Sequence, residues 1–127
     1  MKKSLVGIAT LVPLTLVQAA TSPFEDPATA TYSQKTLLKN WALSVCLAKV
    51  AKNAELKEDA NATASAYMEF GKQPIEAYDA LHDLADRYAH RKYSGAVQSE
   101  FNTMKCIDLL HSKELEALAG KWATSPR

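Results

Sequence analysis

Glycine and histidine are scarce in this chain, which has four glycines and three histidines among its 127 residues. It contains no glycine-rich loop of the kind that cradles phosphate groups. No stretch alternates apolar and polar residues as a half-buried strand does, and β-branched residues rarely follow one another. These absences argue against phosphate-loop chemistry and against a β-sheet, and they favour an all-α fold.

A large charge of either sign is also missing, because the formal net charge of the chain is +1. Removal of the two N-terminal lysines with a leader would leave one more acidic than basic residue. A near-neutral chain has no electrostatic basis for binding nucleic acid or an anionic membrane. We therefore expect a protein or small-molecule partner.

The first nineteen residues have the features of a secretory signal peptide. Two lysines precede an uncharged apolar run from Leu5 to Val17, and small residues suitable for cleavage follow. The run is short for a membrane span and contains Pro13, so an uncleaved anchor is the weaker alternative. We predict cleavage after Ala19, or after Ala20, and a periplasmic protein with no membrane segment.

The longest apolar segment after this leader is WALSVCLAKVA, residues 41–51. Its apolar positions cover almost the whole helical wheel, which is typical of a buried helix. It contains Cys46, and Cys106 is the only other cysteine. In an exported chain this unique pair predicts a disulfide between a central helix and a later one, and two buried free thiols are the alternative.

The predicted architecture is one domain, residues 31–127, built as an all-α bundle of four main helices and a short fifth. Residues 20–30 contain two prolines and are predicted to form a flexible N-terminal arm. Helical spacing of apolar residues places the helices at 31–52, 55–70, from Pro74 onward, at 96–110 and after Ser112.

Local signals refine the ends and faces of these helices. Thr31 followed by Gln34 fits a capping box, Gly71 fits a glycine cap that ends the second helix, and Ser112 fits an N-cap. The apolar spacing of the fourth helix predicts a buried face made of Val97, Phe101, Met104 and Ile107.

Catalytic and cofactor sites are not evident. A disulfide would make Cys46 useless as a nucleophile, and His82 with Asp86 is too small a set for a metal site. Met68 or Met104 with His111 would suit haem in a helical bundle, which leaves a small-ligand or haem-binding protein as an alternative function. By elimination we predict a binding protein without enzymatic activity, metal or cofactor.

Five blocks in order carry a family resemblance: YSQKTLLKNWALSVCLA, LKEDANATASAYMEFG, PIEAYDALHDLADRY, KYSG and SEFNTMKCIDLLHSKELEALA. Together they span about Tyr32 to Lys121 and include both cysteines. The sequence resembles the all-helical immunity proteins that neutralise type VI secreted amidases. The resemblance implies a periplasmic homodimer that blocks an NlpC/P60-type peptidoglycan amidase delivered by sister cells.

Two surfaces are candidates for binding that partner. The first is the turn of Arg91, Lys92, Tyr93, Ser94 and Gly95, which combines an aromatic anchor with cations and a glycine. The second is the acidic face of the third helix, formed by Glu76, Asp79, Asp83 and Asp86. The alternative is an ordinary turn in which Ser94 caps the fourth helix.

Overall fold

The computed structural model describes residues 28–124, and all regular structure in that range is helical. This result confirms the predicted all-α class. The predicted signal peptide, residues 1–19, and most of the predicted arm lie outside the described residues. A short 3-10 helix, η1, precedes five α-helices: η1 (Ala28–Thr31), α1 (Gln34–Val50), α2 (Ala54–Glu69), α3 (Ile75–Ala89), α4 (Asn102–Leu110) and α5 (Lys113–Ala123).

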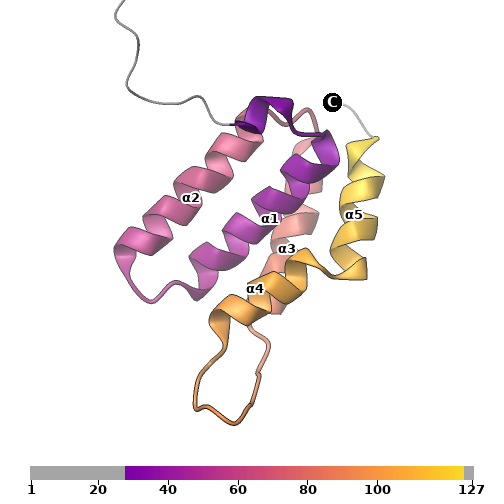
Figure 1. The fold of residues 1–127 in the computed structure, drawn as a ribbon. Helices are drawn as coiled ribbons and strands as arrows, with labels where there is room; N and C mark the ends of the chain where they lie inside the picture. The colour runs from indigo at the N-terminus through magenta and orange to yellow at the C-terminus, as the bar shows by residue number, and fades with distance from the viewer. Residues whose placement is uncertain (1–27, 125–127) are drawn as a thin grey trace, which may run out of the picture.

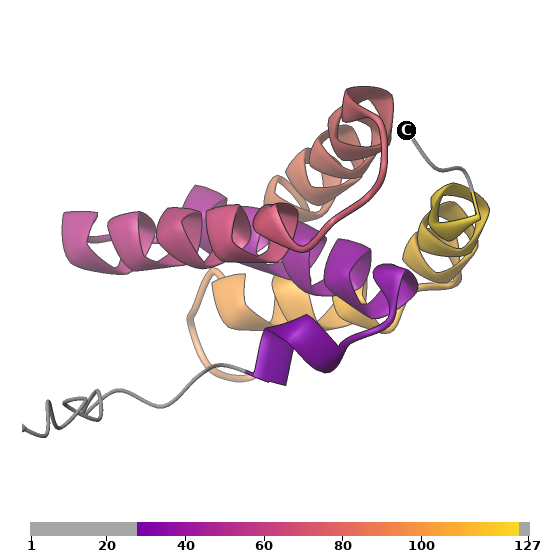
Figure 2. The ribbon, with the colours of Figure 1, turned by 90° about the horizontal axis from the view of Figure 1, so that it is seen from above.

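Helix α1 lies in the middle of the fold and packs against all four other α-helices (Figures 1 and 2). Its side chains Leu38 and Ala42 have no exposed surface. Trp41 packs edge-on against Tyr78 of α3, with 5.1 Å between the ring centroids. The apolar segment at residues 41–51 therefore forms the predicted central helix, and burial of its side chains is the main stabilising term.

The two cysteines form the predicted disulfide. Cys46 of α1 and Cys106 of α4 are bonded, with their Cα atoms 5.6 Å apart, and both side chains are completely buried. The bond joins residues separated by 60 positions. It fixes α4 to the central helix and also decides which face of α4 points inward.

That orientation contradicts the predicted buried face of the fourth helix. Val97, Met104 and Ile107 are 71%, 47% and 48% exposed, while Cys106 and Leu109 are fully buried. Successive residues of a helix are rotated by about 100°, so the inward direction of Cys106 turns Met104 and Ile107 away from the core. The predicted helix start at Ala96 was also wrong, because α4 begins only at Asn102.

The predicted helix caps were correct at one of three positions. Ser112 accepts a hydrogen bond from the Leu115 amide at 3.0 Å, as expected of an N-cap. Thr31 ends η1 instead of beginning α1, because its hydroxyl donates to the Ala28 carbonyl; Ser33 caps α1 in its place. Gly71 does not adopt the left-handed conformation of a glycine cap.

Candidate functional site

The segment between α3 and α4 forms a loop that projects beyond the helical bundle (Figure 1). We refer to residues 91–101 as the connecting loop and to residues 94–98 as its tip. All five tip residues are exposed. Functional residues are often found on loops that a rigid scaffold positions, so this segment is the first place to look for a binding site.

The outgoing stem of the loop, residues 91–93, is anchored by contacts of two aromatic residues, Tyr88 and Tyr93. The guanidinium of Arg91 lies 3.5 Å from the centre of the Tyr88 ring, a cation–π contact at the end of α3. The Tyr93 hydroxyl donates a 2.6 Å hydrogen bond to Oδ2 of Asp108 on α4. This bond to a carboxylate, together with partial burial, raises the pKa of Tyr93 above its ordinary value.

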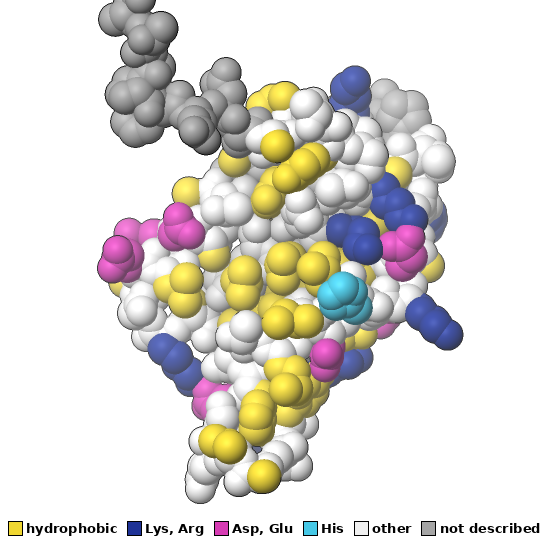
Figure 3. Space-filling model, in the orientation of Figure 1, with side chains coloured by type: hydrophobic (Ala, Val, Ile, Leu, Met, Phe, Trp, Pro, Cys, Tyr) yellow, Lys and Arg dark blue, Asp and Glu magenta, His cyan; other side chains and the backbone are white. Residues whose placement is uncertain are grey.

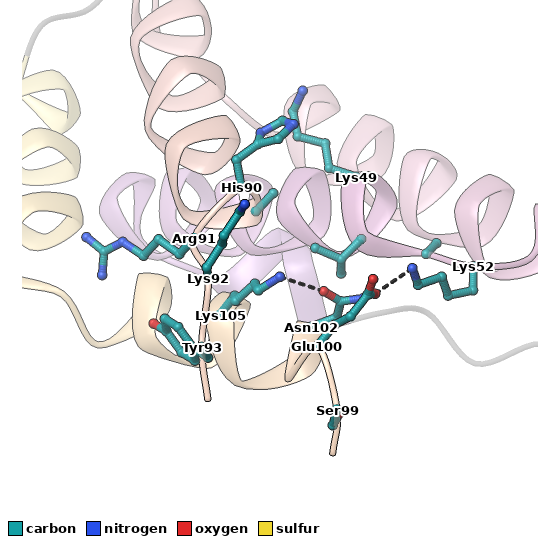
Figure 4. Close-up of a pocket in the computed structure, with 13 residues that line it drawn as sticks. Lys49, Lys52, His90, Arg91, Lys92, Tyr93, Ser99, Glu100, Asn102 and Lys105 are labelled. Carbon is teal, nitrogen blue, oxygen red and sulfur yellow. Dashed lines mark hydrogen bonds and ion pairs between the residues drawn. The ribbon is translucent and has the colours of Figure 1, made fainter. Parts of the chain in front are cut away.

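The returning stem of the loop, residues 99–101, is anchored by a chain of polar contacts, shown in Figure 4. The ammonium of Lys52, beyond the end of α1, lies 2.5 Å from Oε2 of Glu100. Asn102 Nδ2 donates to that same oxygen at 2.9 Å. The pKa of Glu100 is lowered by these contacts, first by Lys52 and then by Asn102. The stem is thus tied to the end of the central helix.

Gly95 and Phe101 pack against each other between the two stems. A Cβ atom added to Gly95 would lie 2.9 Å from Cζ of the Phe101 ring, so only glycine fits without displacing the ring. Phe101 has a φ of 52°, the left-handed conformation that is rare for an aromatic residue. Its amide donates to Ser99 Oγ at 3.1 Å. These contacts hold the loop in one shape, and a preorganised loop loses less entropy on binding.

An exposed apolar surface continues from the loop tip along α4. Its members are Val97, Met104 and Ile107, which sequence reasoning had placed in the core. Hydrophobic side chains gather on this part of the molecule in Figure 3. The polar run Gln98-Ser99-Glu100, which interrupts the apolar pattern just before Phe101, is the signal that could have revealed an exposed loop.

The structure brings the five predicted loop residues together but separates them from most of the predicted acidic face. Residues 91–95 form the first half of the connecting loop, and all except Tyr93 are exposed. Glu76, Asp79 and Asp83 are exposed along α3. Asp86 contacts Lys49 at 2.8 Å, and a hydrogen bond from Lys49 lowers the pKa of Asp86. Ser94 does not cap α4, whose N-cap position is Phe101.

The haem alternative lacks a suitable pair of side chains. His111, the histidine of both predicted pairs, is exposed, as is Met104, while Met68 is partly buried against the core, so neither methionine forms a pair with His111 inside the bundle. Within residues 28–124, no group of three or more potential metal ligands was found. The same range contains no helix that is long and apolar enough to span a membrane.

Comparison with known proteins decides between the remaining functions. The profile of the Tai4 family, described as type VI secretion system amidase immunity proteins, matches residues 36–119, from α1 into α5. The chain belongs to this family. Immunity proteins are inhibitors, so the Tai4 fold serves binding and the chain is not an enzyme.

Solved structures agree with the Tai4 assignment. A chain from the Salmonella typhimurium Tae4/Tai4 effector–immunity system is 52% identical, with a TM-score of 0.73, covering 76% of this chain and 96% of that one. A chain from Serratia marcescens type VI toxins and self-resistance proteins is 30% identical, with a TM-score of 0.73, covering 86% and 91%. No curated protein matched.

A third structure pairs partners from two organisms. It is a complex of Tae4 from Salmonella typhimurium with Tai4 from Enterobacter cloacae. Its matching chain is 27% identical to the present one over 76% of this chain and 99% of that one, with a TM-score of 0.66. Recognition between a Tae4 effector and a Tai4 protein therefore crosses species boundaries in that complex.

Proposed function

We propose that this chain is a periplasmic immunity protein that binds a Tae4-type peptidoglycan amidase and blocks its substrate groove with the connecting loop. The observation that carries the proposal is the shape of that loop, which projects from the bundle (Figure 1) and is anchored at both stems. An exposed, preorganised loop can enter a narrow groove and exclude a peptide without reacting. The target enzyme would be a cysteine amidase of the NlpC/P60 type.

Residues 91–95 would supply the first contacts. Arg91 and Lys92 can donate to carbonyl or carboxylate groups, while Ser94 and Gly95 let the backbone approach the groove wall. Tyr93 is fixed to Asp108, so it positions the tip more than it inserts. Among the residues that the structure describes, Val97, at 71% exposure, is the most exposed large hydrophobic side chain, and it would be the anchor at the tip.

The acidic side chains of α3 would have a lesser role at the rim of the interface. Glu76, Asp79 and Asp83 are exposed and can steer association with a basic patch on the amidase. Asp86 is engaged with Lys49, so its charge is partly offset. Exposed rim charges change association rates more than affinity.

Export and assembly complete the proposal. Residues 1–19 would be removed as a signal peptide, residues 20–30 would form an arm, and residues 31–127 would act as the inhibitory domain in the periplasm. The Cys46–Cys106 disulfide suits that oxidising compartment. We expect a homodimer, for which the exposed Met104 and Ile107 offer apolar surface. Sedimentation at micromolar concentration that shows only monomer would contradict the dimer.

The decisive experiment measures inhibition of peptidoglycan hydrolysis by purified Tae4 from Salmonella typhimurium, the effector named with two of the structural relatives. Val97→Asp should weaken inhibition at least tenfold, because it places a charge in a desolvated groove. Leu56→Asp on α2 is the matched control, since Leu56 is also exposed, at 49%, and lies on another helix. Equal inhibition by the two variants would show that the loop is not the blocking element.

A further inference from the structure

A cleft of about 540 Å³ opens at the base of the connecting loop, between the ends of α1 and α3 and the start of α4 (Figure 4). Its lining includes the apolar residues Val50, Ala51 and Ala89. Its walls carry five lysine or arginine side chains and a single carboxylate, that of Glu100. The five cationic residues are Lys49, Lys52, Arg91, Lys92 and Lys105.

The surrounding protein neutralises only part of this positive charge. Lys49 is paired with Asp86, and Lys52 with Glu100. The carboxyl-terminal ends of α1 and α3 border the cleft, and each helix end carries about half a negative charge. Two carboxylates and two helix C-termini offset roughly three of the five positive charges, and the N-terminus of α4 adds about half a positive charge, so a net excess of positive charge remains.

Two lysines account for that excess. Lys92 is exposed and has no ion-pair partner within residues 28–124. Lys105 is only 7% exposed, and its ammonium donates to a neutral amide oxygen, Asn102 Oδ1, at 2.8 Å. An ammonium group has three donors, and the bond to Asn102 uses one of them, so Lys105 can donate to a further acceptor. Because Lys105 lines an open cleft, an anion that enters the cleft can bind its ammonium group.

We propose that this cleft binds a carboxylate from an acidic side chain on the rim of the amidase groove. The proposal rests on the proposed function: if the loop enters the groove, the groove rim comes to lie against the loop base. Lys92 supplies the exposed cation that attracts the carboxylate, and Lys105 supplies a fixed, partly desolvated donor. Because Lys105 is largely buried, its charge is screened less by water and salt than that of an exposed lysine.

A direct test needs no amidase. The labelled chain is titrated at low salt with a blocked glutamate–glycine peptide, while amide resonances are followed by NMR. The glutamate peptide should shift the resonances of Lys92, Lys105 and their neighbours, and the matched glutamine peptide should not. The combined Lys92→Gln, Lys105→Met variant should lose the response. Equal responses to the two peptides, or shifts spread over other lysines, would overturn the proposal.

A second test places the cleft in the inhibitory complex. Lys92→Gln should slow association with Salmonella typhimurium Tae4 by about fivefold at low salt and reduce the salt dependence of the rate. Lys113→Gln removes the same charge from an exposed position on α5 and is the control. If wild type fails to bind Tae4, the proposed function fails; if wild type binds and the two variants associate equally, only the carboxylate site is refuted.

Discussion

The hydroxyl of Tyr93 and the carboxylate of Asp108 lie 2.6 Å apart and join the outgoing stem of the connecting loop to α4. The two residues are 15 positions apart in sequence, so the bond ties the beginning of the loop to the helix that follows it. A hydrogen bond to an ionised group is stronger than one between two neutral groups. It restricts the loop without using any residue of its tip.

Tyr93→Phe tests this anchor, because it keeps the ring and removes only the donor. We expect the free energy of unfolding to fall by about 1 kcal/mol, the usual net value of an intramolecular hydrogen bond, because exposure to water offsets the added strength of a bond to a carboxylate. Inhibition of Tae4 should weaken several-fold because the loop must then be ordered on binding. Melting curves and inhibition assays measure the two effects. Unchanged inhibition would mean that Tyr93 does not preorganise the loop.

Two glycines should respond in opposite directions to alanine. A Cβ at Gly71 would lie 1.9 Å from the hydroxyl of Tyr78, whose side chain is buried, so Gly71→Ala should destabilise the fold by about 1–3 kcal/mol. Gly120 lies inside α5, and apart from its chain neighbours and the backbone of its own helix no atom lies within 4 Å of an added Cβ. Gly120→Ala should stabilise the fold by about 0.5–1 kcal/mol through helix propensity. Denaturant titration of both variants provides the comparison.

The disulfide should contribute a large part of the stability of so small a domain. A cross-link that closes a loop of this length is worth about 4 kcal/mol in the chain-entropy treatment. The Cys46→Ala, Cys106→Ala double variant should therefore unfold at much lower denaturant concentration. Native wild type should show no reactive thiol without reductant, whereas two labelled thiols per chain would contradict the bond in the folded protein.

Acid sensitivity should depend on Glu116, which joins α5 to α1. Its carboxylate bonds Lys35 and, at 2.8 Å, Lys39, and these two contacts lower its pKa from 4.5 to about 2. A carboxyl whose folded pKa is lowered stabilises the fold above its unfolded pKa, and this contribution is lost as pH falls. The Glu116→Gln variant should therefore lose stability relative to wild type at neutral pH.

The difference between wild type and Glu116→Gln should shrink as pH falls from about 4.5 through about 2, since the wild-type carboxyl becomes protonated over this range and loses the charge that glutamine lacks. Melting temperatures measured across that range test the expectation. Glu58→Gln on α2 is the control, because Glu58 has no ion-pair partner in the described part of the chain. A pH-independent difference would show that the Lys35 and Lys39 contacts do not stabilise the fold.

The central helix was predictable from the apolar pattern of one segment, and the disulfide was predictable from the number of cysteines. Residues 41–51 are apolar on nearly every side, so the helix had to be buried, and two cysteines allow one intramolecular pair. The Ser112 cap was equally accessible, since an N-cap acts within four residues of chain. These features are local in sequence or unique in number.

The start of α4 and the anchors of the loop were not predictable in the same way. The spacing of Val97, Phe101 and Met104 suits a helix, and nothing local reveals that Cys106 turns this face outward. The contact between Lys52 and Glu100 joins the ends of two different helices, so periodicity within one element does not show it. Tertiary packing decides such features, and local propensity is only a weak guide to them.

The separation between the loop tip and the core has an evolutionary consequence. The stems hold the loop through Tyr93, Glu100 and the packing of Phe101 against Gly95, whereas the tip residues 94–98 are all exposed. Surface substitutions away from such anchors usually change stability by less than about 0.5 kcal/mol. Mutations at the tip positions other than Gly95 can therefore accumulate without destabilising the fold. If the loop is the inhibitory element, as proposed, an immunity protein with this loop can adapt to a changing toxin one residue at a time.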